Sequence, residues 1–215
     1  MALVAVSNQM IEFYKSKYPE IRTRFINLPI FSSNLIENQT RNYDGKLNIV
    51  YSGGSHKWQN VDLMVETINK IIDDFDITIL TPDIEIFKDK LSKYNIQDKV
   101  TIKQVEPNMV KEEYKKAHLG FILRDDIIVN KVACPTKLVE YLSCGVIPIV
   151  LQPEIGDFNY LGYSYILNDD LVQGKIPDKE ALKQMCENNY RVIEKLQGIQ
   201  AKGKRELERF LLERR

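Results

Sequence analysis

The sequence predicts an α/β fold: a Rossmann-like parallel sheet with helices on both faces, followed by carboxyl-terminal helices. Short apolar stretches rich in valine and isoleucine alternate along the chain with amphipathic segments of about 10–15 residues. The apolar stretches are nearly uninterrupted, as in strands that are buried on both faces of a parallel sheet. Hydrophobic residues make up 44% and charged residues 28% of the 215 positions, a balance typical of globular proteins.

The individual elements follow from these patterns in chain order. Apolar and β-branched runs predict strands at 3–6, 24–31, 47–52, 77–80, 100–105, 119–124, 147–151 and 164–168. Helical periodicity predicts helices at 8–18, 58–72, 84–94, 108–117 and 135–144, each of them between two strands. A final helical region covers 178–215, where we expect Gly198 and Gly203 to bend the helix or to break it in two.

These elements group into three segments. Residues 1–44 hold a strand, a helix, a strand and most of a polar, turn-rich linker at 32–46. Residues 45–175 form the Rossmann-like domain, and residues 176–215 form the closing helices. The last stretch is amphipathic, so we expect one face to pack on the domain and the other to face water. A peripheral contact with a membrane is the weaker alternative, because glutamates dilute the positive charge of this stretch.

The composition excludes several classes of partner and site. Thirty basic residues balance thirty acidic ones, so no overall field attracts nucleic acid or an anionic membrane. No apolar run approaches the roughly 18 residues that are needed to cross a bilayer. Cys134, Cys144 and Cys186 lack the spacing of metal ligands, so we expect reduced packing residues in a cytoplasmic protein. The acidic motif DFD at 74–76 precedes its strand, at the sheet edge away from ligands, and we expect no metal there.

The loop after the strand 47–52 is one candidate for ligand binding, because ligands of open parallel sheets collect at the carboxyl ends of the strands. Gly53 and Gly54 allow a tight turn close to a ligand. The helix that follows would direct its first N–H groups at an anion. Taken alone, the loop is equally well explained as a tight strand–helix connection.

Lys137 is the more specific signal. It lies in the first turn of the helix that Pro135 and Thr136 open, where the helix dipole favours negative charge. An ion pair with Glu140 would contribute only a few tenths of a kcal/mol, about as much as the dipole costs the lysine. We therefore favour an anion bound at this helix end, where the lysine and the dipole both attract it.

Several stretches together resemble the carboxyl-terminal, donor-binding domain of GT-B glycosyltransferases. They are KLNIVYSGGSHKWQNVDLMVETI (46–68), VTIKQV (100–105), GFILRDDIIVNKVACPTKLVEYLSCGVIPIV (120–150) and PEIGDFNYLG (153–162). The group that they resemble most is the retaining family-four enzymes of bacterial surface polysaccharide synthesis, and PTKLVEYLSCG is the most specific part. Residues 1–44 are similar to the end of the amino-terminal domain and the linker in such enzymes. The closing helices are similar to the element that crosses back towards that domain.

The resemblance implies that the ligand is a nucleoside diphosphate sugar, UDP- or GDP-linked, and that no cofactor and no metal take part. Glu140 matches the family glutamate that hydrogen-bonds the ribose hydroxyls. The positions that would receive the diphosphate are Gly53, Gly54, Pro135, Thr136, Lys137 and Leu138.

Two positions depart from the family pattern. Val132 stands where the family has a further glutamate that contacts the sugar, and Ser55 stands where it has a phosphate-binding arginine. Asp125 or Asn130 would then contact the sugar from the same loop. Lys57 or Arg124 would supply the missing cation.

A GT-B enzyme uses two Rossmann domains, whereas 215 residues hold only one, so the resemblance implies half of an enzyme. We expect this half to bind the nucleotide sugar in the cytoplasm or at the inner face of the membrane. An amino-terminal domain would then contact the glycan or lipid-linked acceptor and carry part of the catalytic machinery, whose residues the sequence does not identify. Two alternatives remain: a degenerate, non-catalytic binding or interaction module, and half of a GT-B-like sugar-nucleotide epimerase.

Overall fold

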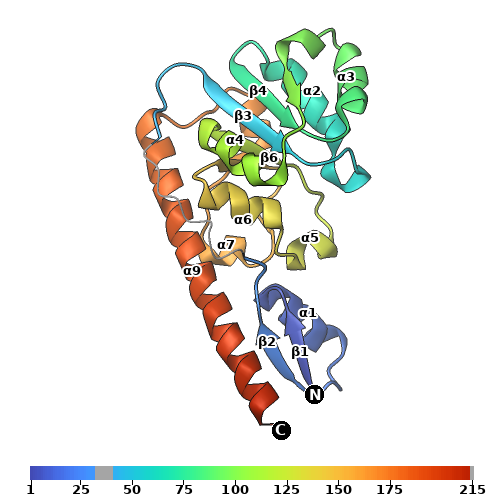
Figure 1. Cartoon of the computed structure of the whole chain (residues 1–215), viewed down its shortest axis with the longest axis vertical. Coiled ribbons are helices and arrows are strands. Elements are labelled where there is room, and N and C mark those ends of the chain that lie inside the picture. The colour runs from blue at the N-terminus through green and yellow to red at the C-terminus, as the bar shows by residue number, and fades with distance from the viewer. Residues whose placement is uncertain (32–40, 214–215) are drawn as a thin grey trace.

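A computed structural model describes residues 1–31 and 41–213. Six parallel strands form one sheet in the order β5-β4-β3-β6-β7-β8 (Figure 1). Their bounds are β3 (Leu47–Ser52), β4 (Phe75–Leu80), β5 (Thr101–Lys103), β6 (Leu119–Ile122), β7 (Ile147–Val150) and β8 (Ile166–Leu167). The chain runs outward from β3 to β5 and then returns to the other side of β3, as in a doubly wound Rossmann sheet. The predicted fold class is therefore confirmed.

Helices cover both faces of this sheet because successive strand residues point to opposite sides. On one face, Ile49 and Tyr51 of β3 belong to a buried cluster with α2 (Val61–Ile71) and α3 (Ile84–Ser92). On the other face, Val50 belongs to a second cluster with α4 (Val110–Lys116) and α6 (Thr136–Ser143). The short helices are η1 (Lys57–Gln59), η2 (Gln97–Lys99), η3 (Pro107–Met109), α5 (Ile128–Val132), α7 (Phe158–Leu161) and α8 (Asn168–Val172).

The closing region is one continuous helix, α9 (Lys179–Leu212), so the predicted bend or break at its glycines is wrong. Gly203 is buried, and a Cβ atom there would lie 2.0 Å from the carbonyl oxygen of Asn27. The glycine thus allows close approach between α9 and the amino-terminal strands. Gly198 has open space around it, and packing of the helix on both sides of it outweighs its low helical propensity of about 1 kcal/mol.

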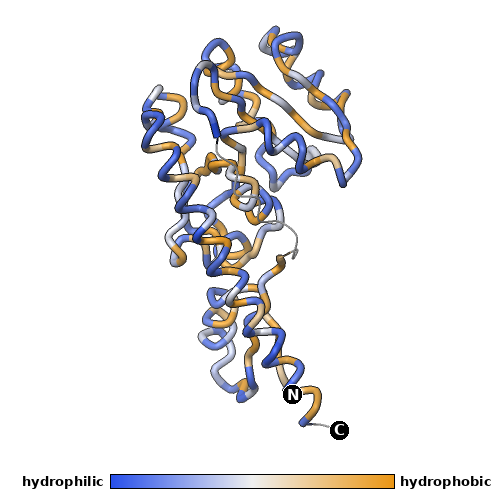
Figure 2. The backbone as a smooth tube through the Cα atoms, turned by 60° about the vertical axis from the view of Figure 1, so that its left-hand side comes forward, coloured by the Kyte–Doolittle hydropathy of each residue, from blue (hydrophilic) through white to orange (hydrophobic). Residues whose placement is uncertain are grey.

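One face of α9 packs on the domain and the other faces solvent, as predicted. Hydrophobic and hydrophilic residues alternate along the helix in Figure 2, which is the pattern of an amphipathic surface helix. Its buried residues Val192, Ile193 and Leu196 join the cluster of α6. None of the helices in the described ranges is both long enough and apolar enough to cross a membrane.

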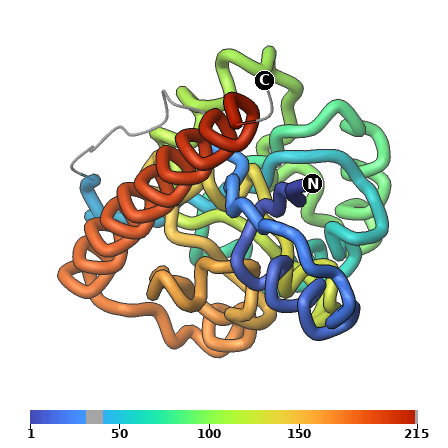
Figure 3. The backbone as a smooth tube through the Cα atoms, turned by 90° about the horizontal axis from the view of Figure 1, so that it is seen from below, coloured from blue at the N-terminus to red at the C-terminus, as the bar shows by residue number. Residues whose placement is uncertain are grey.

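The amino-terminal residues form a small unit of their own, in which β1 (Ala2–Ala5) and β2 (Arg24–Asn27) pair in parallel around α1 (Asn8–Lys17). Figure 3 shows this unit beside the carboxyl-terminal end of α9. Asp157, a buried carboxylate of the domain, accepts hydrogen bonds from the first N–H groups of α1 at 2.7 and 3.0 Å. It thereby caps α1 and docks the unit on the domain.

The predicted linker lies partly outside the described residues, which resume at Arg41. Arg41 is buried, and its guanidinium donates hydrogen bonds to the carbonyl groups of Tyr114, Ala117 and Cys144. These carbonyls lie at the carboxyl-terminal ends of α4 and α6, where a cation complements the helix dipoles. The turn-rich composition of this region gave no signal for such an anchor.

Two smaller predictions concern cysteines and the acidic motif. Cys134, Cys144 and Cys186 are all buried thiols, as expected of packing residues. Asp76 lies at the start of β4, on the amino-terminal edge of the sheet, and pairs with Lys46 at 3.3 Å. Within residues 1–31 and 41–213 no three His, Cys, Asp or Glu side chains are grouped as metal ligands.

Candidate functional site

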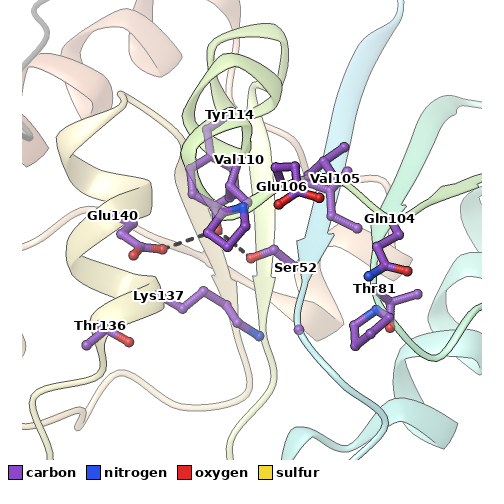
Figure 4. A pocket seen from close by; sticks show the side chains of 14 residues that line it. Ser52, Thr81, Gln104, Val105, Glu106, Val110, Tyr114, Thr136, Lys137 and Glu140 are labelled. Atoms are coloured by element: carbon purple, nitrogen blue, oxygen red, sulfur yellow. Dashed lines mark hydrogen bonds between the residues drawn. The ribbon is translucent and has the colours of Figure 1, made fainter.

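A pocket of about 500 Å³ opens at the carboxyl ends of β3, β4 and β5, next to the start of α6 (Figure 4). The strand order reverses beside it, between β3 and β6, and ligands of open α/β sheets usually bind at such a point. Its lining residues are Ser52, Gly53, Leu80, Thr81, Pro82, Gln104, Val105, Glu106, Pro107, Val110, Tyr114, Thr136, Lys137 and Glu140. The volume lies within the range of small-molecule sites.

Lys137 projects from the first turn of α6 into this pocket. Its ammonium group donates a hydrogen bond to the Gln59 side-chain oxygen at 3.1 Å and lies 4.2 Å from the centre of the Tyr51 ring. Within the described residues it forms no ion pair with Glu140, although the helical spacing would allow one. The lysine is thus held by a neutral amide and an aromatic face, and its charge is left for a ligand.

The electrostatic state of Lys137 follows from this environment. Desolvation lowers its pKa to about 7, and the positive charge of Arg124 acts in the same direction. Glu140 opposes the shift only in part. Lys137 therefore changes charge near neutral pH while no anion is bound.

Glu140 also faces the pocket, one helical turn further along α6. Its carboxylate accepts a hydrogen bond from the hydroxyl of the buried Tyr114 at 3.3 Å, and that hydroxyl also contacts the hydroxyl of Ser52. Desolvation raises the pKa of Glu140, against the opposing effects of Tyr114 and Lys137. Figure 4 shows this chain of side chains across the wall between α6, α4 and β3. It orients a carboxylate that can accept hydrogen bonds from ligand hydroxyls.

The Gly-Gly loop forms the adjacent wall, and its hydrogen bonds are largely satisfied from within. Gly53 adopts a φ of +142°, and its N–H donates to the carbonyl of Leu80. The backbone N–H and the hydroxyl of Ser55 both donate to one oxygen of Asp83, at 2.7 and 2.9 Å. These bonds lower the pKa of Asp83 and keep it ionised. An internal carboxylate therefore occupies donors that a ligand oxygen would otherwise use.

The structure brings four of the predicted residues together at the pocket, namely Gly53, Thr136, Lys137 and Glu140. Gly54 is not among the lining residues, and its carbonyl accepts a hydrogen bond from the Tyr51 hydroxyl at 2.7 Å.

The other predicted residues lie outside the lining. Leu138 is fully buried in the core, and Pro135 precedes α6 as its cap residue. Lys57 is exposed on η1. Asn130 is buried and bridges its own loop, because it accepts a hydrogen bond from Arg124 at 3.2 Å and donates to the Asp125 carbonyl at 2.9 Å.

Several lining residues carry no signal in the sequence pattern. Tyr114 lies on a helix that the sequence predicts only as cover for the sheet, and Ser52 looks like the last residue of a strand. Gln104 follows β5, and only its place after a strand end could have drawn attention to it. Asp83 resembles an ordinary residue at a helix start until its contact with Ser55 is seen.

Similar folds occur among solved structures. The chain matches the GtfA/B complex with a TM-score of 0.72 and 12% identity, over 97% of this chain and 45% of that one. It matches HepE of Anabaena, solved in complex with UDP-glucose, with a TM-score of 0.68 and 12% identity, over 95% of this chain and 63% of that one. WaaG, a glycosyltransferase involved in lipopolysaccharide biosynthesis, gives a TM-score of 0.65 and 14% identity over 95% of this chain and 61% of that one.

These proteins are GT-B glycosyltransferases. The chain has the fold of a GT-B carboxyl-terminal domain. It spans roughly half to two thirds of the length of these structures, at identities that establish the fold alone. No protein-family model and no curated protein sequence matches the chain.

Proposed function

We propose that this chain is the donor-binding half of a retaining, metal-independent glycosyltransferase that uses a nucleoside diphosphate sugar. One observation carries the proposal. Lys137, which has no ion-pair partner among the described residues, and the oriented carboxylate of Glu140 line the same pocket from successive turns of α6. Lys137, at the helix start, suits a diphosphate, and Glu140 suits the hydroxyls of the ribose next to it. The fold shared with HepE, which was solved with UDP-glucose, supports the same ligand class.

In the proposed reaction the bond between the sugar and the diphosphate breaks, and negative charge grows on the departing diphosphate. The ammonium group of Lys137 and the free N–H groups at the start of α6 would stabilise that charge in a partly desolvated site. A fixed cation of this kind can take the place of a divalent metal. Glu140 would hold the nucleoside and would not exchange a proton with the sugar.

The acceptor is proposed to be a glycan or a lipid-linked sugar, bound by a second domain. The solved structures that the chain matches are longer, and the chain covers 45%, 61% and 63% of three of them. We therefore assign the residues that bind the acceptor to an amino-terminal GT-B domain. The reaction is proposed to take place in the cytoplasm or at the inner face of the membrane. We expect the 215-residue chain to bind the donor but to transfer no sugar.

Thermal unfolding with UDP, GDP, ADP and CMP at millimolar concentration tests donor binding. A nucleotide at 100 times its dissociation constant should stabilise the protein by about 2.7 kcal/mol. For a chain of this size the midpoint should rise by about 5–10 °C. The variant Glu140→Ala should lose most of that rise, whereas Glu180→Ala, in an exposed first-turn position of α9, should keep it.

One observation favours a second function, a degenerate module that binds a partner and no nucleotide. The carboxylate of Asp83 already occupies the donors of Ser55, where the family pattern has an arginine. This alternative predicts that no nucleotide shifts the midpoint, even when an amino-terminal GT-B domain is added. A shift that appears only with the added domain would support the proposed transferase instead.

A further inference from the structure

The two ends of the pocket differ in chemistry. Thr136, Lys137 and Glu140 form one end, at the start of α6. The segment 104–107, which follows β5, forms the other, and Figure 4 shows its side chains across the pocket from α6. If the diphosphate lies at the lysine, as in the proposed function on which this inference rests, the base of the nucleotide lies at the segment 104–107.

This far end combines apolar surface with two polar side chains that have no partner among the described residues. Val105, Pro107 and Val110 supply apolar surface on which an aromatic ring can stack. The side chains of Gln104 and Glu106 are exposed, and neither makes a hydrogen bond or an ion pair within residues 1–31 and 41–213.

The backbone holds Glu106 in place, although its side chain is free. Its own carbonyl accepts a hydrogen bond from the N–H of Met109 at 2.8 Å, which closes the turn of η3. Pro107 follows directly and restricts the backbone at the turn. The main-chain carbonyl is thus engaged, and the carboxylate is the acceptor that this residue offers to a ligand.

A carboxylate distinguishes the nucleobases by their hydrogen-bonding edges. An ionised carboxylate only accepts hydrogen bonds. Guanine presents two neighbouring donors, the N1–H and the exocyclic amine, which match its two oxygens, and the guanine O6 would remain for the amide of a glutamine. Uracil presents a single N–H between two carbonyl oxygens, which the carboxylate would repel. Adenine and cytosine each present an acceptor beside their amino group.

We propose that the nucleotide of the donor is a guanosine diphosphate, and that Glu106 reads the guanine edge with Gln104 beside it. Glu106 is then a specificity-determining residue. Its carboxylate attracts the two donors of guanine. It disfavours uracil, because the partly negative carbonyl oxygens of uracil would face the carboxylate without a donor. A site built to pair with specific donors rejects a base that lacks them more strongly than shape alone can.

Binding of GDP and UDP to the full chain, measured by isothermal titration calorimetry, tests this proposal. GDP should bind at least about tenfold more tightly than UDP. In the variant Glu106→Gln, GDP affinity should fall by about tenfold while UDP affinity stays level or rises, because an amide can donate to a uracil oxygen. Glu85→Gln, an exposed glutamate on α3 outside the pocket lining, is the matched control and should keep the wild-type ratio.

The outcomes separate this inference from the proposed function. UDP binding as tight as or tighter than GDP binding to the wild-type chain would overturn the guanine assignment and leave the donor-binding proposal in place. A GDP preference that survives Glu106→Gln would overturn the role of Glu106. No binding of either diphosphate, to the chain alone or with an added amino-terminal GT-B domain, would overturn the proposed function together with this inference. The ratio of two ligands on one protein sample does not depend on how much of a variant is folded.

Discussion

Two elements meet at the end of the pocket assigned to the diphosphate, and they differ in how far their own polar groups are satisfied. In the loop 53–55, the N–H groups of Gly53 and Ser55 donate to Leu80 and Asp83. At the start of α6 no side chain caps the first turn, and Lys137 has only the neutral Gln59 as its hydrogen-bond acceptor among the described residues. Two of the three N–H groups of the loop are thus bonded without a ligand, whereas the first turn of α6 has no side-chain cap.

This difference indicates where binding energy would arise. A desolvated lysine without a counter-ion destabilises the empty protein, and an anion removes that penalty when it binds. The loop has no such deficit, because Asp83 supplies the negative charge itself. We therefore expect changes at Lys137 to dominate ligand affinity, and changes around Ser55 to adjust it.

Replacing Lys137 with methionine should have the largest effect. Loss of a charged hydrogen bond of about 1.5–3 kcal/mol should weaken nucleotide binding by roughly 10–150-fold in calorimetry. The empty variant should also unfold at a higher temperature, since an apolar chain replaces a desolvated charge. Because the pKa of Lys137 is lowered to about 7, this gain should be full below pH 7 and shrink towards pH 10.

The same substitution at Lys183, an exposed lysine of α9, is the control and should leave binding unchanged. Equal nucleotide affinity in the Lys137 variant and the wild type would mean that the start of α6 contributes no more to binding than the loop 53–55.

Replacing Gly53 with alanine should destabilise the protein by about 1–3 kcal/mol, because an L-residue is strained at a φ of +142°. The added Cβ atom would also lie 3.2 Å from the Lys137 ammonium nitrogen and disturb it. Thermal unfolding should show a midpoint lowered by several degrees. Gly198→Ala is the matched control: it lies within a helix, has open space around it and should raise the midpoint slightly.

Binding of a nucleoside diphosphate sugar should weaken as the pH rises above about 7. The bound diphosphate favours charged Lys137, whose pKa without ligand is about 7, so binding above this pH takes up a proton. Affinity should fall by up to about tenfold per pH unit. The charges of Arg124 and Glu140 adjust the pKa of Lys137 and with it the pH at which the fall begins. Calorimetry from pH 6 to 9 measures the slope, and a slope that persists in Lys137→Met would assign it to another group.

Replacing Asp83 with asparagine should have the smallest effect and the opposite sign. The amide oxygen can still accept from Ser55, but the negative charge near the diphosphate is gone. Affinity should rise by about threefold at low salt, and the gain should shrink at high salt because exposed charges are screened. Weaker nucleotide binding in this variant would mean that Asp83 contributes to affinity, and that the loop 53–55 matters for binding as the start of α6 does.

The regular part of the fold could be predicted from the sequence because its signals are local. Apolar β-branched runs and helical periodicity located the strands and helices of the sheet, and Gly53 and Lys137 could be placed at its ligand edge by the rule of strand ends. Element ends were less certain: the strand predicted at 100–105 is β5 at 101–103, because only those residues pair with β4.

The failures of prediction have one physical cause, which is contact between residues far apart in the chain. Gly203 reads as a helix breaker, yet it is the place where α9 touches the carbonyl of Asn27. Arg41 reads as part of a turn-rich linker, yet it is buried and donates hydrogen bonds to the carbonyls of Ala117 and Cys144.

The sequence by itself thus determined the alternation of elements, the sheet edge at which a ligand would bind and the unusual lysine at a helix start, since each depends on neighbouring residues. Only the tertiary structure decided which partners these residues have. In the structure Lys137 bonds to the amide of Gln59 and not to Glu140, and Glu140 accepts a hydrogen bond from Tyr114. Asp83 accepts the hydrogen bonds of Ser55 in the Gly-Gly loop, and Glu106 lines the pocket without a partner among the described residues. The reason is that hydrogen bonding and desolvation depend on distances in space, which separation along the chain does not specify.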